Sequence, residues 1–256
     1  MTWRAPLSAV FAALVGAAAA AEPNADAAHY QRCILQVAQN PSAALEAAKS
    51  WEAEDGGGPA GHCEALALLA LKRPADAAAR LEALAIAPGD YDTTLRADLF
   101  AQAGNAWLVA EKPDKAIDDL NAAIERAQST RIGSAKFALY YSDRARARLL
   151  RDERVEAQGD LDHSIALMPT ALALTLHAHV RREAKDGKTA AVDLSRALVL
   201  DPNFAEAYLE RGRLSAMNGN AKAARADFLK AAMMEKGDVA EAARLEIQAL
   251  DVKAAH

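Results

Sequence analysis

The chain has 256 residues and a formal net charge of −5, and 52% of its residues are hydrophobic while only 5% are aromatic. An acidic chain with interspersed charges lacks the basic surface of a nucleic-acid-binding protein, so we expect no nucleic-acid partner. Much of the apolar content is alanine, which suits closely stacked helix pairs better than one thick core.

The N-terminus has the layout of a secretory signal peptide over residues 1–21. One positive charge, Arg4, precedes an apolar run at 7–15, and the small residues that follow end at Ala21. The alternative, a transmembrane anchor, is disfavoured because the apolar run is short and rich in alanine. The sequence therefore predicts export and, for a bacterial source, a periplasmic protein with no stable membrane insertion after signal removal.

Residues 22–90 are expected to form helix pairs at about 26–54 and 60–87, with a glycine-rich break at 56–58 between them. Asn40 followed by Pro41 is typical of a helix cap and a first-turn proline. Cys33 and Cys63 are separated by 30 residues, close to one repeat length, so we expect them on neighbouring helices. In an oxidising compartment we expect a disulfide worth about 3–4 kcal/mol, with two separate buried thiols as the alternative.

A pattern of about 34 residues recurs between residues 97 and 236. In each copy an aromatic or large apolar residue is followed four positions later by a small residue, then by a turn and a second helix. The clearest copy runs from Ala205 to Ala231. The second helices carry matching alanines, spaced by 41, 33 and 34 residues, at Ala116, Ala157, Ala190 and Ala224. The first gap is longer because of an insert near 131–136.

This pattern resembles that of the tetratricopeptide-repeat (TPR) family. The resemblance implies an all-α, right-handed α-solenoid of stacked antiparallel helix pairs. Small residues are needed where the two helices of a pair cross, and a proline after the second helix prevents its continuation. Asp238 can cap a last helix from Val239 to about Val252, which would cover the open end of the stack. The expected organisation is a signal peptide at 1–21, degenerate helix pairs at 22–90, TPR repeats at 91–236 and a capping helix with its tail at 237–256.

Catalytic motifs are missing from the sequence: it has no nucleophile elbow, no glycine-rich phosphate loop and no H-E-x-x-H. His62 and Cys63 are adjacent, but neighbours on a helix point about 100° apart and make a poor base and nucleophile. Glu183 follows His179 by four residues, so a weak surface metal site stays open. We expect no enzymatic activity, no cofactor and no dedicated metal site.

The TPR resemblance implies that the first helix of each pair lines a concave groove that binds a protein or peptide. The residue after each mid-helix small residue should point into this groove, and the four such residues are all hydrogen-bond donors: Asn105, Arg146, His179 and Arg213. One turn further lie apolar residues that could form pockets: Val109, Leu150 and Met217. We call the four donors the donor ladder and expect it to bind peptide carbonyls, acidic side chains or a C-terminal carboxylate. The alternative is an ordinary solvated face, with Arg146 paired to Asp143 three residues earlier.

The function that these observations favour is a non-catalytic scaffold or adaptor in the periplasm that binds a protein or peptide. Two alternatives remain: a cell-envelope enzyme or carbohydrate-binding factor on a TPR frame, and a self-associating structural protein.

Overall fold

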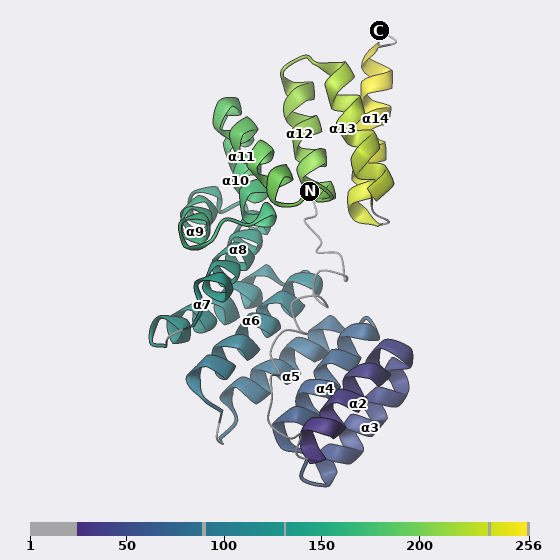
Figure 1. Cartoon of the computed structure of the whole chain (residues 1–256), viewed down its shortest axis with the longest axis vertical. Helices are drawn as coiled ribbons and strands as arrows, with labels where there is room; N and C mark the ends of the chain where they lie inside the picture. The colour runs from purple at the N-terminus through teal and green to yellow at the C-terminus, as the bar shows by residue number, and fades with distance from the viewer. Residues whose placement is uncertain (1–24, 89–90, 131, 235–236, 255–256) are drawn as a thin grey trace. The chain divides into compact units, whose positions relative to one another are not determined.

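The computed structural model describes residues 25–88, 91–130, 132–234 and 237–254, and every regular element in these segments is an α-helix (Figure 1). The predicted signal peptide at 1–21 lies outside the described residues. Among the helices in the described segments, none is both long enough and apolar enough to cross a membrane. The chain divides into two compact units, residues 1–133 and 134–256.

The described residues of unit 1 form three helix pairs. They are α2 (Ala25–Gln39) with α3 (Pro41–Ala53), α4 (Gly57–Ala70) with α5 (Pro74–Ile86), and α6 (Thr93–Val109) with α7 (Pro113–Gln128). The first two pairs occupy the segments that the sequence predicts at about 26–54 and 60–87. The expected sequence boundary at 90/91 falls between α5 and α6, which pack directly against each other.

The described residues of unit 2 form three further pairs and one more helix. They are α8 (Ser134–Leu150) with α9 (Arg154–Leu167), α10 (Ala171–Glu183) with α11 (Gly187–Leu200), and α12 (Ala205–Met217) with α13 (Ala221–Met234), followed by α14 (Asp238–Ala254). Helix α14 packs on α13 and also touches α12 (Figure 1). This is the place of the predicted capping helix, whose first residue is Asp238. The predicted insert coincides with the link between α7 and α8.

Small residues lie where the helices of a pair cross, as the sequence pattern predicts. A methyl group added at Gly104 would lie 2.7 Å from Leu120 Cγ, and one at Gly212 would lie 2.4 Å from the Phe228 ring. Neither distance is compatible with ordinary van der Waals contact. Close approach of the two backbones therefore requires glycine here, and the large residue opposite fills the space that glycine leaves.

The turn inside a pair has the same form at five places. The residue after the last turn of the first helix adopts a left-handed conformation, with φ between 58° and 77°. The amide of the next residue then donates to the carbonyl five positions earlier, as from Asp186 to Arg181 at 2.8 Å. This is a Schellman motif, which satisfies carbonyls that the helix end would leave unpaired. The five left-handed residues are Lys72, Glu111, Asp152, Lys185 and Gly219.

Candidate functional site

The donor ladder residues of unit 2 lie on the first helices of their pairs, but each already has a partner. Arg146 on α8 is buried, and its Nη1 lies 3.4 Å from Asp143 Oδ1. This is the local ion pair that the sequence analysis left as an alternative. Asn105 lies half-buried on α6 in unit 1.

His179 and Arg213 belong to one buried ionic cluster around Glu210, whose side chain is 1% exposed. Arg213 donates to Glu210 at 2.6 Å and to Glu246 of α14 at 2.8 Å. Arg182 donates to Glu210 Oε2 at 3.1 Å, and His179 Nδ1 lies 3.4 Å from the same oxygen. Burial acts to raise the pKa of Glu210, but contact with His179 and the charges of Arg213 and Arg182 outweigh it and lower the pKa to about 2.

This cluster joins α10, α12 and α14. His179 and Arg213 of the donor ladder therefore stabilise the packing of these three helices independently of any ligand. The predicted apolar residues at the next turn are partly accessible: Val109 and Leu150 are half-buried, and Met217 is 49% exposed. Binding of a peptide by the donor ladder and these apolar residues stays a prediction.

A second set of ion pairs, which the sequence analysis missed, links the two helices of a pair at a fixed separation of sixteen residues. Arg144 binds Asp160 through two nitrogens at 2.9 and 2.6 Å, and Arg211 binds Asp227 at 2.8 and 2.7 Å. His177 Nδ1 lies 2.7 Å from Asp193. In the α4–α5 pair the charges are exchanged, with Glu64 on the first helix and Arg80 on the second at 2.7 Å. The regular spacing of these residues is visible in the sequence and would have predicted them.

The α6–α7 pair lacks such a contact because Ala103 occupies the position at which α4, α8, α10 and α12 carry an ionisable partner. Its aspartate, Asp119, is 7% exposed, and Oδ2 is buried with no hydrogen-bond partner among the described residues. Burial first, and then the neighbouring carboxylate of Glu82, raise the pKa of Asp119 to about 8. The Trp107 indole N–H donates to Glu82, which holds that carboxylate in place.

A cavity of about 480 Å³ lies in unit 1, where the first helices α2, α4 and α6 meet. Its wall is mostly apolar or aromatic, with two carboxyl groups. The residues that line it are Asp26, Ala27, Tyr30, Gly58, Pro59, His62, Tyr91, Leu95, Asp98, Leu99 and Gln102. We call this space the unit 1 cavity.

A chain of hydrogen bonds crosses the unit 1 cavity wall from α2 to α6. The Gln102 amide oxygen can only accept, so His62 donates to it from Nε2 at 2.7 Å. His62 Nδ1 is then the acceptor for the Tyr30 hydroxyl, at 2.6 Å. Burial lowers the pKa of His62 below its usual 6.5, and burial raises that of Tyr30 to about 12. Both side chains are therefore neutral at pH 7.

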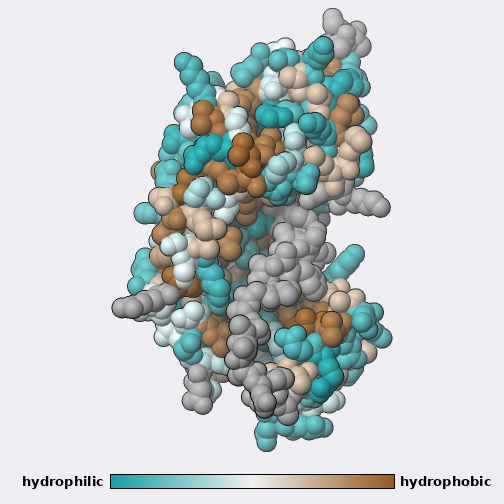
Figure 2. All heavy atoms as spheres, in the orientation of Figure 1, coloured by the Kyte–Doolittle hydropathy of each residue, from teal (hydrophilic) through white to brown (hydrophobic). Residues whose placement is uncertain are grey.

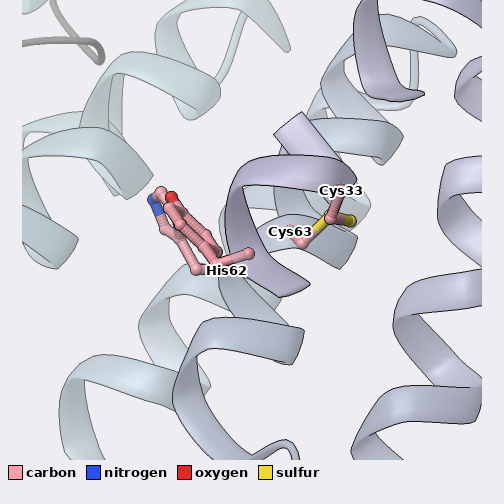
Figure 3. The surroundings of a disulfide bond; sticks show 4 residues. Cys33, His62 and Cys63 are labelled. Atoms are coloured by element: carbon pink, nitrogen blue, oxygen red, sulfur yellow. A yellow bond between two sulfur atoms is a disulfide. The ribbon is translucent and has the colours of Figure 1, made fainter. Parts of the chain in front are cut away.

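The predicted disulfide between Cys33 and Cys63 is present and joins α2 to α4, with 6.3 Å between the Cα atoms. Both cysteines are buried. The His62 side chain extends away from the disulfide, as Figure 3 shows. The Cys63 sulfur is bonded to Cys33, and the His62 imidazole faces the unit 1 cavity. His62 and Cys63 therefore do not form a base and a nucleophile.

Gly58 is required by the packing of Tyr91 at the edge of the unit 1 cavity. A methyl group added at Gly58 would lie 0.9 Å from the Tyr91 hydroxyl oxygen. Burial raises the pKa of Tyr91 as well. The repeat pattern could not predict this cavity, because most of its lining outside α6 comes from the degenerate part of the chain. The residues that it brings together, Tyr30 with His62 and His62 with Gln102, are 32 and 40 residues apart.

Within the described segments, no three His, Cys, Asp or Glu side chains come together in an arrangement that could hold a metal ion. Glu183, which the sequence analysis considered as a metal ligand with His179, instead lies 2.7 Å from Arg182.

The sequence matches no protein-family model and no curated protein. The fold is similar to that of a TPR protein from Parabacteroides merdae ATCC 43184, at 16% identity and a TM-score of 0.65, over 93% of this chain and 89% of that one. PilF from Pseudomonas aeruginosa is 14% identical, with a TM-score of 0.68 over 89% of this chain and 97% of that one. A chain of the APC/C hetero-tetramer Cut9–Hcn1 gives 0.68 at 13% identity over 95% of this chain, which spans 45% of that longer chain. The repeated sequence pattern, the helix pairs and these likenesses together show that the chain has the fold of a tetratricopeptide-repeat protein.

Proposed function

We propose that this protein is a periplasmic scaffold or adaptor that binds another protein or a peptide through the faces formed by its first helices. The observation that carries the proposal is the unit 1 cavity, a preformed hollow lined by three successive first helices. Concave, mostly apolar sites with a few fixed polar groups are typical of ligand recognition.

The polar groups of the unit 1 cavity suit binding better than catalysis. His62 uses both ring nitrogens in hydrogen bonds to Tyr30 and Gln102, and Cys63 is held in the disulfide. Hydrogen bonds of this kind fix side chains in one orientation, which lowers the entropy lost on binding. Binding without turnover is therefore the proposal.

Site-specific photo-crosslinking in cells tests this proposal. A photoreactive amino acid would replace Leu95, which is 40% exposed at the unit 1 cavity, or Met217, which is 49% exposed at the end of α12. Matched control positions lie on second helices: Ile86 is 69% exposed and Val192 is 58% exposed. We expect a discrete crosslinked partner from a first-helix position and none from the controls.

Self-association is the alternative that the same experiment can detect. Hydrophobic side chains gather in several small patches on the face shown in Figure 2. In unit 2, Val155, Val199 and Met233 on second helices are each more than 80% exposed. Crosslinks to a second copy of the chain, or equal crosslinking from first and second helices, would contradict the scaffold proposal.

The periplasmic location has its own test. The N-terminal sequence of the protein purified from the envelope fraction should begin just after residue 21. A protein that retains Met1 and fractionates with the cytoplasm would contradict the periplasmic location. The binding role would still be tested by the crosslinking experiment.

A further inference from the structure

We propose that the exposed face of helices α11 and α13 in unit 2 adsorbs reversibly to an anionic lipid surface. The proposed function concerns the first helices, whereas α11 and α13 are second helices, so this role is additional to it. The two helices are neighbours, because Leu198 of α11 packs against the core cluster that contains Ala224 and Phe228 of α13.

Helices α11 and α13 carry a different charge from the other second helices. Each has a single acidic residue, Asp193 or Asp227, which is buried and bound by the first helix of its pair. By contrast, α3, α5, α7 and α9 each carry at least two acidic residues. The exposed basic residues of α11 and α13 are Lys188, Arg196, Lys222 and Lys230. A chain with a net charge of −5 therefore presents a basic face here.

The acidic residues that lie near the two helices already have partners. Asp186 and Asp201, at the two ends of α11, accept hydrogen bonds from backbone amides at 3.1 and 2.9 Å. Asp251 of α14 is paired with Arg225, which is half-buried on α13. In the part of the chain that the structure describes, none of these three carboxylates pairs with one of the four exposed cations.

Arg196 and Lys230 remain accessible to an external anion. Arg196 Nη1 lies 3.7 Å from Asp193, which is longer than a hydrogen bond, and the Arg196 side chain is 50% exposed. Lys230 Nζ lies 5.0 Å from the centre of the Tyr208 ring, and Lys230 is exposed. Both cations can therefore bind a phosphate group as a further partner.

Exposed apolar side chains share these helix faces with the cations. They are Val192, Val199 and Leu200 on α11 and Leu229, Met233 and Met234 on α13. Leu200 lies one helical turn after Arg196, and Met234 lies one turn after Lys230, so each cation and its apolar neighbour are on one side of the helix. The two sets are 34 residues apart, which is one repeat. We call these cations and apolar residues together the α11–α13 face.

The α11–α13 face has the two kinds of group that an anionic lipid surface binds. Val199 is 81% and Met233 is 84% exposed, so both protrude and can enter the boundary between headgroups and acyl chains while lysine and arginine pair with phosphate. A hollow of about 320 Å³ beside them combines an apolar wall with one guanidinium group. Its lining residues are Pro169, Ser195, Arg196, Val199 and Leu200. Adsorption of this kind is peripheral and needs no helix that crosses the bilayer.

Other occupants match the α11–α13 face less well. A second copy that used the same face would bring like charges together. A nucleic acid would pair with the cations but would leave the protruding valine and methionine side chains against phosphate. An acidic amphipathic helix of a partner protein would need holes that fit the protruding side chains, whereas a lipid surface adapts to them.

The experiment uses the mature chain from residue 22, with its disulfide intact, and vesicles of phosphatidylcholine, either pure or with an equal part of phosphatidylglycerol. The measurement is the fraction of protein that sediments with the vesicles as the lipid concentration rises, which gives a partition coefficient. Each lysine or arginine near an anionic surface strengthens binding about fivefold. We expect partition into the anionic vesicles to be at least about 25-fold stronger than into the neutral ones, and to weaken as sodium chloride is added.

Charge variants locate the lipid-binding face. Arg196→Gln/Lys230→Gln should weaken partition into anionic vesicles about 25-fold, fivefold for each charge. Arg73→Gln/Lys112→Gln makes the same change in net charge in unit 1 and should leave the partition coefficient within about twofold. The control is well matched, because the Arg73 and Arg196 side chains are 53% and 50% exposed and each has an aspartate three residues away.

Apolar variants separate insertion from simple attraction of charge. Val199→Ser/Met233→Ser keeps every charge and should weaken partition at least about tenfold, because two apolar side chains no longer leave water. Ile86→Ser/Val155→Ser is the control on α5 and α9, where these side chains are 69% and 81% exposed, and it should have little effect. Circular dichroism and melting curves would show that each variant is folded.

Three outcomes would overturn the proposal. They are equal partition into neutral and anionic vesicles, equal losses in the face variants and their controls, and no partition into either vesicle. In the last case, a protein crosslinked in cells from a photoreactive residue in place of Met233 would assign the face to a protein partner instead. Crosslinks from Leu95 and Met217 test the proposed function on α6 and α12, so that function stands or fails separately.

Discussion

At the scale of single residues, Asp119 shows how one missing partner changes the chemistry of a repeat. The equivalent aspartates, Asp160 and Asp227, are each held by two nitrogens of an arginine on the first helix of the same pair. Ala103 removes that partner, and Glu82 brings a second carboxylate instead. Two carboxyl groups this close in a buried place favour keeping one of them protonated.

The pH dependence of folding follows from this arrangement. The pKa of Asp119 is about 8 in the folded protein, against a usual 3.8, so the folded state holds a proton that the unfolded chain releases between these values. The stability that this carboxyl contributes is therefore fully present below pH 3.8, decreases as the pH rises above that value, and is lost once the pH has passed through about 8. Asn mimics the protonated carboxyl at every pH, so Asp119→Asn should stabilise the protein already at pH 6 and by at least about 1 kcal/mol more at pH 9, measured by urea unfolding.

Asp160→Asn is the matched control. It removes the buried negative charge that pairs with Arg144 and Arg148, so it should destabilise the protein by about 3–5 kcal/mol at both pH values. Equal effects of Asp119→Asn at pH 6 and pH 9 would contradict the assignment of a raised pKa.

At the scale of helices, much of the fold could be predicted because the rules that specify it are local. Gly104 and Gly212 mark helix crossings, Pro41 follows a capping asparagine whose side chain accepts from the Ala43 amide, and the alanine spacing gives the pairs. The donor ladder shows the limit of such rules. The helical phase placed Arg213 on a first helix, but its partner Glu246 is 33 residues away, and this contact depends on how α14 packs.

The unit 1 cavity could not be predicted from the sequence for a related reason. Tyr30 and His62 come from two helices whose sequences have drifted from the repeat, so the repeat pattern does not assign them Gln102 of α6 as a neighbour. By contrast, the pairs separated by sixteen residues could have been found, because both members lie within one helix pair and recur with the repeat.

The turns inside the pairs give a prediction at this same scale. Lys72 and Lys185 are exposed and adopt left-handed φ values of 59° and 63°. A side chain costs about 1–2 kcal/mol in this region, and glycine returns about 0.4–1 kcal/mol of that through greater freedom in the unfolded chain. Lys72→Gly and Lys185→Gly should each stabilise the protein by about 0.5–1 kcal/mol in thermal or urea unfolding.

Lys49→Gly provides the contrast, because Lys49 lies within helix α3 and is also exposed. Glycine in a helix interior should destabilise the protein by about 1 kcal/mol. If all three substitutions destabilise by similar amounts, the left-handed turns carry no strain that glycine relieves.

At the scale of the whole molecule, the repeated fold determines how far a local change spreads. Within each unit, a helix pair contacts chiefly the pair next to it, so the stability of a unit is approximately a sum over its pairs and their interfaces. The Cys33–Cys63 disulfide ties α2 to α4 and so acts on two neighbouring pairs at one end of unit 1. Its contribution to stability should therefore be large and confined to these two pairs.

Reduction of this disulfide tests that expectation. The chain-entropy estimate for a loop of this length predicts a loss of about 3–4 kcal/mol in the stability of the first pairs. Hydrogen exchange should accelerate in α2, α3 and α4 after reduction, while the amides of α10, α11 and α12 keep their protection. Cys33→Ser/Cys63→Ser should reproduce the exchange pattern without reductant and respond no further to it. Faster exchange of the same size in both units would instead mean that the molecule unfolds as one cooperative block, because nearest-neighbour coupling would then extend the loss at α2 and α4 through every later pair.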